Sequence, residues 1–143
     1  MIKSTTFHYQ IHDGEAERAS NSYLMSLIVI IVGLPLPIVN LLATVIFYFG
    51  NRKSTEFVRW HCTQALYSQL SLFIVNSIGF WWTISIITDD LTLSNYYIAY
   101  LIVLFLSNFA EFIATIYTAG AVRKHKHVEW FFYADLTDQS IRR

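Results

Sequence analysis

One long apolar segment, residues 55–87, constrains the fold of this chain more than any other. It opens with charged and aromatic residues, and after Arg59 it carries no further charge until Asp89 and Asp90. A run of about 20 apolar residues is enough to cross the hydrocarbon core of a bilayer. The segment therefore predicts a transmembrane helix over residues 57–87, with its first residues at the membrane surface.

Two further apolar segments, residues 23–49 and 96–122, repeat this pattern. We therefore predict an all-α, polytopic membrane protein in which three transmembrane helices form a small bundle. The composition agrees, because only 14% of the residues are charged, against about 25% in soluble domains. The predicted transmembrane domain covers residues 23–126. A polar N-terminal tail precedes it at residues 1–22, and an interfacial, aromatic C-terminal tail follows at residues 127–143.

Pro35 and Pro37 interrupt the first predicted span. Each proline removes a backbone donor and clashes with the preceding helical turn, so a straight helix is not expected. Either one kinked helix or two half-helices in a re-entrant hairpin fits the region from Gly33 to Pro37. We favour the kinked helix, because each half alone is too short to cross the bilayer.

The basic residues predict the orientation. Loops on the cytoplasmic side carry an excess of Lys and Arg, and the connection between the second and third spans carries neither. With three spans, this places the N-terminus outside and the C-terminus in the cytoplasm. The first 22 residues lack the pattern of a cleaved signal peptide, so we expect the first apolar segment to remain. The basic residues that flank the first and third spans are Arg52, Lys53, Arg59, Arg123, Lys124 and Lys126.

Polar side chains recur within each predicted span at spacings of three and four, which keeps them on one helix face. Hydrocarbon cannot satisfy such groups, so we expect these faces to meet in a polar seam. The seam residues are Asn40, His61, Gln64, Ser68, Asn108, Glu111 and Thr115.

Glu111 is the most unusual residue of the seam. At ~1.5 Å per residue it lies about 18 Å from Arg123, near the middle of a bilayer. A carboxylate there is costly unless it is protonated or well partnered. It is either a structural hydrogen-bonding residue or a carrier of protons or cations. We favour the structural role, because no second acidic residue lies at that depth.

A second group of residues is expected at the cytoplasmic interface. Long basic side chains extend toward phosphates, and tryptophan prefers the headgroup level. The basic run 123–127, which includes His125 and His127, is interpreted as a solvated flank attracted to anionic lipid. The interfacial or lipid-contacting residues are Arg59, Trp60, Lys124, Lys126 and Trp130.

We find little support for metal or catalytic chemistry. His8 and His12 have a helical spacing, but no further ligand completes a shell, so we expect a solvated tail and no metal or cofactor. Cys62 is the only cysteine, which excludes an intrachain disulfide. Serines follow His61 on one helix, yet neither an oxyanion hole nor a third group accompanies them. We therefore expect no enzyme, and the net charge of zero argues against a nucleic-acid partner.

The stretch Phe-Val-Arg-Trp-His-Cys-Thr-Gln-Ala-Leu at residues 57–66 resembles a known family. These are small bacterial membrane proteins of unknown function, related to the small polytopic subunit of the chloroplast inner-envelope protein import translocon. The resemblance covers about residues 23–133 and differs at Ala134, where many relatives have proline. It implies a polytopic fold, the bacterial inner membrane and a role as a subunit. The matching positions are Pro37, Asn51, Lys53, Phe57, His61, Gln64, Ala65 and Leu66.

We therefore expect a non-enzymatic integral membrane subunit, an accessory or scaffold component of a larger complex that is related to protein translocation. Its partners would be lipid and other membrane-protein subunits, or its own copies, because its aromatic content of 17% exceeds what one small bundle buries. The import activity of the plant protein is not carried over. The alternative is a small ion, proton or solute transporter whose path follows the polar seam past Glu111, and an intramembrane enzyme ranks third.

Overall fold

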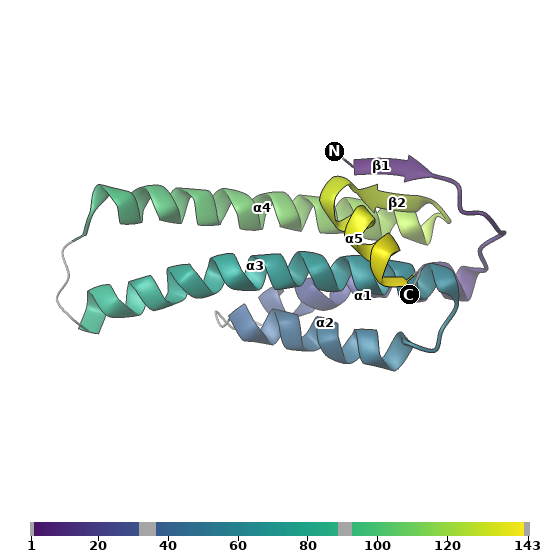
Figure 1. Cartoon of the computed structure of the whole chain (residues 1–143), viewed down its shortest axis with the longest axis horizontal. Helices are drawn as coiled ribbons and strands as arrows, with labels where there is room; N and C mark the ends of the chain where they lie inside the picture. The colour runs from purple at the N-terminus through teal and green to yellow at the C-terminus, as the bar shows by residue number, and fades with distance from the viewer. Residues whose placement is uncertain (1, 32–36, 89–92, 142–143) are drawn as a thin grey trace.

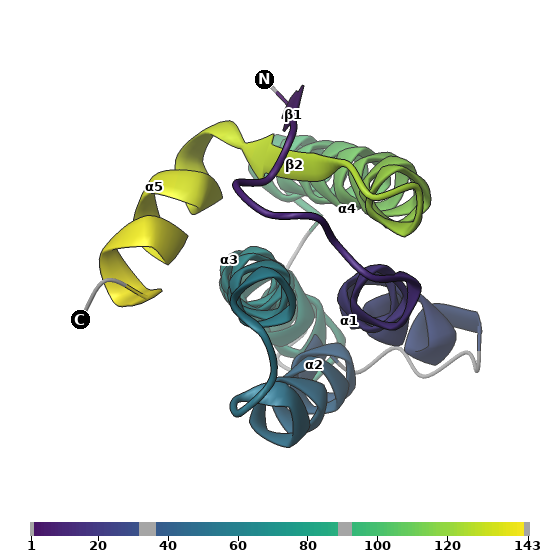
Figure 2. The ribbon, with the colours of Figure 1, turned by 90° about the vertical axis from the view of Figure 1, so that its right-hand side faces the viewer.

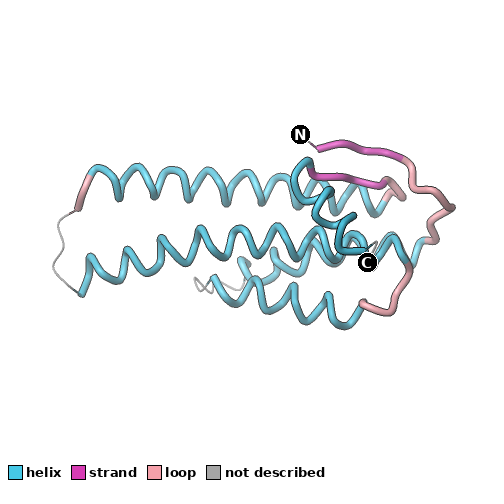
Figure 3. The backbone as a smooth tube through the Cα atoms, viewed as in Figure 1, coloured by secondary structure: helices cyan, strands magenta, loops and turns pink. Residues whose placement is uncertain are grey.

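The computed structural model describes residues 2–31, 37–88 and 93–141 (Figure 1). The class is all-α, as the sequence predicts, with a small two-stranded antiparallel sheet at one end (Figure 3). The helices of the described ranges are α1 (Asp13–Ile31), α2 (Pro37–Asn51), α3 (Glu56–Thr88), α4 (Asn95–Arg123) and α5 (Phe131–Ile141), and the strands are β1 (Ile2–Thr5) and β2 (His127–Trp130).

Two of the described helices, α3 and α4, are long and apolar enough to cross a membrane. They contain 33 and 29 residues, which at ~1.5 Å per residue gives about 50 and 43 Å, more than the roughly 30 Å of hydrocarbon. In each helix only 6% of the most apolar window is buried. The core helix of a soluble protein has the opposite pattern, so these surfaces suit lipid.

The first expected span, residues 23–49, is not one kinked helix. The chain just before α1 lies beside the start of α3, as the hydrogen bond from the Phe57 N–H to the Tyr9 hydroxyl (3.3 Å) shows. The short connection after α2 also leads into the start of α3. α1 and α2 therefore run antiparallel as a helical hairpin (Figures 1 and 2). The α2 helix has 15 residues, about 22 Å, and is too short to cross a bilayer.

The hairpin corrects our preference for a kinked helix, and three full-length spans are not confirmed. Residues 32–36, with Gly33 and Pro35, lie outside the described residues. Pro37 is the first residue of α2, where the missing N–H has no helical partner to lose. In the sequence, two helical halves and one kinked helix have the same apolar pattern, because proline disrupts both alike.

The two ends of the chain lie at the same end of the molecule. β1 pairs antiparallel with β2, with Ile2 opposite Trp130 and Thr5 opposite His127. The expectation that the N-terminal and C-terminal tails lie on opposite sides is therefore wrong. The physical reason is the hairpin, which returns the chain to its starting end before α3 begins. Residues of both predicted tails instead belong to the folded part of the protein.

A tight turn after α4 directs the chain back along that helix. His125 has a positive φ of 63°, a conformation that helix C-termini commonly use. Its N–H donates to the Val122 carbonyl (3.0 Å), and the Lys126 N–H donates to the Ala121 carbonyl (3.2 Å). These two bonds form a Schellman motif, after which β2 runs beside the last turns of α4.

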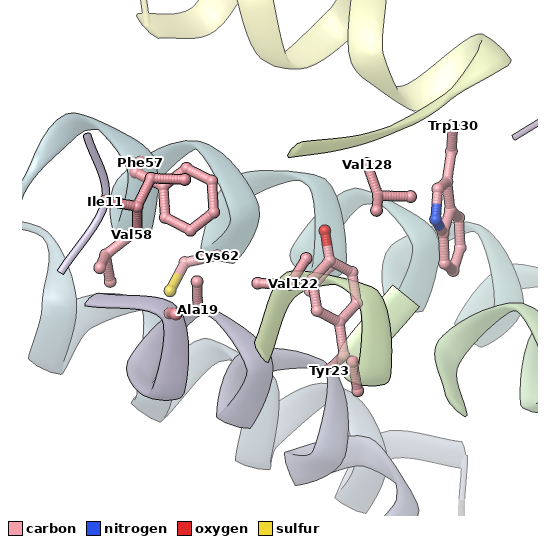
Figure 4. Close-up of a cluster of buried hydrophobic side chains, with 12 residues drawn as sticks. Ile11, Ala19, Tyr23, Phe57, Val58, Cys62, Val122, Val128 and Trp130 are labelled. Atoms are coloured by element: carbon pink, nitrogen blue, oxygen red, sulfur yellow. The ribbon is translucent and has the colours of Figure 1, made fainter. Parts of the chain in front are cut away.

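The hydrophobic core lies at this same end of the molecule (Figure 4). Ala16 and Ala19 of α1 are almost fully buried, and their small side chains let α1 approach α3 and α4 closely. Side chains from α1, α3, α4 and β2 meet there. The larger members are Ile11, Tyr23, Phe57, Val58, Val122, Val128 and Trp130.

The hairpin makes a prediction about topology. In a Cys62→Ser background, single cysteines at positions Ser4, Gln139 and Asn95 should fall into two groups by their labelling when intact cells are treated with a membrane-impermeant maleimide. Asn95→Cys lies at the opposite end of α4 and should be labelled from outside. Ser4→Cys and Gln139→Cys should react only after permeabilisation, because β1 and α5 share one side. Labelling of Ser4→Cys together with Asn95→Cys, and not with Gln139→Cys, would contradict the hairpin.

Candidate functional site

His61 of α3 lies at the centre of a buried polar cluster. Its side chain is fully buried, and its two ring nitrogens contact different elements. Nδ1 is 2.9 Å from the Tyr23 hydroxyl of α1, and Nε2 is 3.2 Å from Nδ1 of His127 in β2. His61 therefore joins three segments that are far apart in the chain.

Gln64, one turn further along α3, completes this cluster. Its Nε2 donates to the Tyr23 hydroxyl (2.8 Å) and to the Val128 carbonyl (3.1 Å). Its Oε1 accepts from the Trp130 N–H (3.0 Å). The Gln64 amide thus pairs with one carbonyl and one N–H of β2, as a residue of a neighbouring strand would. We call Tyr23, His61, Gln64 and His127 the clasp, because together they hold β2 against α1 and α3.

We assign the protons of the clasp in one arrangement that satisfies its hydrogen bonds. Gln64 donates to the Tyr23 oxygen, so the Tyr23 hydrogen is available to Nδ1 of His61. His61 then carries its proton on Nε2 and donates to Nδ1 of His127. His127 in turn carries its proton on Nε2, which lies 3.4 Å from the Glu129 carboxylate. This assignment requires both imidazoles to be neutral.

Burial favours the neutral form of His127. Desolvation of the imidazole lowers the pKa of His127 to about 4, and the nearby Asp138 carboxylate only partly opposes this effect. The sequence analysis placed His127 in a solvated basic flank, but the side chain is buried. No local sequence pattern indicates that His127 lies in a strand, because this strand is defined by its pairing with the distant β1.

Trp60 and Trp130 differ from their expected interfacial positions. Both are 5% exposed, and each indole N–H donates to a protein acceptor. Trp60 donates to the Asp138 carboxylate of α5 (2.7 Å), and Trp130 donates to the Thr118 hydroxyl of α4 (2.7 Å). The C-terminal segment supplies these contacts, and it is packed against the helices where an interfacial tail was expected. The basic residues of the predicted interfacial set, Arg59, Lys124 and Lys126, are exposed at this end.

Glu111 of α4 has partners on both long helices. Gln69 Nε2 of α3 donates to its carboxylate (3.3 Å), and the hydroxyls of Ser68 and Thr115 are within hydrogen-bonding reach. Ser68 and Thr115 were placed in the seam from their spacing, whereas Gln69 was not. The carboxyl also borders an open groove of about 490 Å³ between α3 and α4, next to the segment 130–133.

Further polar contacts join α3 and α4 at regular intervals. Asn76 and Asn108 exchange two amide hydrogen bonds (3.0 and 2.7 Å). The Thr83 and Tyr97 hydroxyls are 2.9 Å apart. Gln69, Asn76 and Thr83 are spaced by seven residues along α3, a second stripe that the sequence analysis missed and that this spacing could have revealed.

Asn40 does not join the other seam residues. It begins the second turn of α2, and its carbonyl accepts from the Thr44 hydroxyl (3.0 Å). Its side-chain oxygen is buried without a hydrogen-bond partner. Within the described ranges there is also no group of three or more His, Cys, Asp or Glu side chains that could hold a metal ion.

The clasp makes a prediction about stability. Gln64→Leu should lower the free energy of unfolding by about 2–4 kcal/mol, because two backbone groups of β2 lose their partner and an unsatisfied buried group costs roughly 1–3 kcal/mol. Gln139→Leu, an exposed glutamine of α5, is the matched control and should change little. Chemical unfolding in a mild detergent measures both, and equal effects of the two variants would show that the clasp does not hold β2.

The buried imidazole of His127 predicts a loss of stability in acid. Its folded-state pKa of about 4 lies below the unfolded value of about 6.5, so the unfolded chain takes up the proton first. The contribution of His127 to stability should fall as the pH drops from 6.5 toward 4, by at most roughly 3 kcal/mol. His127→Gln should flatten this part of the pH profile, and an unchanged slope in that variant would contradict the assignment.

Comparison with known proteins gives one match. Neither a curated protein nor a solved structure is significantly similar to the chain. A profile of the magnetosome magnetite crystal formation proteins matches residues 19–136, most of the chain. The match agrees with the bacterial membrane family that the sequence resemblance implied, and it does not extend to the chloroplast translocon. The chain belongs to the magnetosome magnetite crystal formation protein family.

Proposed function

We propose that this protein is a non-catalytic accessory subunit of a bacterial membrane that assists crystal formation, the process named in its family's description. The observation that carries the proposal is the use of its buried polar side chains. Near the membrane surface, His61 and Gln64 are the side chains best suited to bind or react with a ligand. Both are instead used to hold α1 and β2 in place. Groups that are committed to the protein's own fold favour a structural role over a reactive one.

The outward surface supports the same proposal. Large apolar side chains face out along α2, α3 and α4, where lipid or other membrane proteins can cover them. Phe131 and Phe132, at the start of α5, are also exposed, close to the basic residues of the same end. Exposed members along the long helices include Ile74, Ile78, Trp81, Leu101, Phe105, Phe109 and Ile113.

The proposed arrangement in the membrane has two full crossings, α3 and α4. The α1–α2 hairpin enters from the side of the termini and returns to it. Arg52, Lys53 and Arg59 lie at this end together with the basic residues that follow α4, which favours the cytoplasm. Both termini are then cytoplasmic, and the membrane is the bacterial inner membrane or one derived from it.

The resemblance to the translocon subunit supports the general class, a small polytopic subunit of a larger membrane complex. A direct role in protein translocation is not part of the proposal. The partners would be membrane proteins that contact the apolar faces of α3 and α4, or further copies of the chain.

One observation favours a second candidate, a small proton or solute transporter. Glu111 borders the open groove between α3 and α4 at about the middle of α4, and intramembrane carboxylates often mark transport paths. The accessory role is the stronger proposal, because Glu111 also has hydrogen-bonding partners on α3 and on its own helix.

Deletion and complementation in the native bacterium test both candidates. Loss of the gene should change the number or size of mineral crystals in electron micrographs. Glu111→Gln should restore them, because the amide keeps the shape and most hydrogen bonds. Glu111→Leu should destabilise the protein by on the order of 1–3 kcal/mol, since its partners lose a hydrogen bond.

The control is Glu17→Gln, which alters an exposed carboxylate near Arg123 and should complement fully. A Glu111→Gln protein that accumulates normally in the membrane but does not complement would favour the transporter. Crystals that are unaffected by deletion would contradict a role in crystal formation.

A further inference from the structure

A small, partly open cavity of about 80 Å³ lies among the ends of three helices, at the end of the molecule where the termini lie. The last turn of α2 supplies Tyr48 and Asn51, the second turn of α3 supplies Arg59, and the end of α5 supplies Ser140. Arg52, in the connection between α2 and α3, also lines it. The cavity therefore forms only when α5 is packed against the start of α3.

The two arginines that line this cavity have no acidic partner among the described residues. Arg123, by contrast, has Glu17 at 3.8 Å. Two acidic residues close in sequence to the lining are engaged elsewhere: Glu56 lies 3.5 Å from His8, and Asp138 accepts from Trp60. The cavity is thus lined by two arginines for which the described part of the chain shows no salt-bridge partner.

Three neutral polar side chains of the lining, those of Asn51, Thr63 and Ser140, are already hydrogen-bonded to the protein, and the Tyr48 hydroxyl is a further neutral donor there. The Asn51 amide donates to the Phe47 carbonyl (2.9 Å), and the Thr63 hydroxyl donates to the Arg59 carbonyl (2.8 Å). Ser140 bonds to the Tyr67 hydroxyl. The donors that remain for a ligand belong mainly to the guanidinium groups, each of which presents five N–H bonds in a planar fork. Such a donor set matches a ligand with several anionic oxygens.

The position and size of the cavity agree with one such ligand. Phe49, in the last turn of α2, is exposed and apolar, and the charged residues Arg52 and Lys53 follow closely, which in the proposed membrane arrangement places the cavity at the level of lipid headgroups. Its volume of about 80 Å³ is several times the roughly 10–15 Å³ that a single water needs. We propose that the cavity binds one phosphate group, either that of an anionic lipid or free inorganic phosphate.

Binding by the purified protein in a neutral detergent tests this site. The probes are phosphatidylglycerol, followed by native mass spectrometry, and inorganic phosphate, followed by calorimetry. The variant Arg52→Gln/Arg59→Gln should weaken binding of the probe by about tenfold or more, because it removes the charged donors. The matched control, Lys53→Gln/Lys124→Gln, removes the same charge from the same end without touching the cavity, and should retain binding to within about threefold.

The two probes distinguish the sources of the phosphate. Cavity-dependent binding of phosphatidylglycerol alone assigns the site to lipid, and cavity-dependent binding of inorganic phosphate alone assigns it to the free ion. Equal losses in both double variants would show diffuse attraction and overturn the site, as would no binding of either probe to the unaltered protein. If the glutamine variant does not fold, Arg52→Lys/Arg59→Lys keeps the charge and loses the forked geometry, and unchanged binding in it would also overturn the proposal.

Discussion

Within the clasp, the hydrogen bonds between Gln64 and the backbone of β2 are the interaction on which the rest of this fold depends. A buried amide in an apolar environment needs partners for both its N–H and its carbonyl groups. Gln64 finds them in β2 and in Tyr23, and so determines where the C-terminal segment lies. Once β2 is fixed, β1 has a strand to pair with, and α5 follows directly with the contact between Asp138 and Trp60. One side chain of α3 thus links the two ends of the chain.

The same requirement for paired polar groups explains how α3 and α4 stay together beyond the clasp. Lipid is as apolar as a leucine side chain, so burial of hydrocarbon gives little net association between helices in a membrane. Hydrogen bonds between Asn76 and Asn108, and between Thr83 and Tyr97, supply specificity in its place. Gly79 allows close approach between them, since a Cβ there would overlap the side chain of Leu104. Glu111 fits this series as one more contact, with Gln69 opposite it.

The sequence predicted what lies within a helix better than what lies between distant segments. Apolar length located α3 and α4, and spacings of three and four located Ser68 and Thr115 near Glu111, since both signals are local. The hairpin was missed because proline disrupts a kinked helix and a paired half-helix alike. The packed ends were missed for another reason. His127 and Trp130 lie in a strand whose partner is more than 120 residues earlier in the chain, and short polar segments carry no periodicity that indicates such a partner.

The distribution of buried residues divides the molecule into two halves with different roles. On α3 the buried positions run from Phe57 to Gln69, and beyond them only Gly79 is buried in the described part of that helix. On α4 most of them lie in the last third, from Thr115 to Val122. The half near the termini therefore has a core of its own, whereas in the other half α3 and α4 have chiefly each other and their surroundings. Such a division fits the proposed accessory role, in which the packed end would set the angle of the two helices and the exposed end would present them to other membrane proteins.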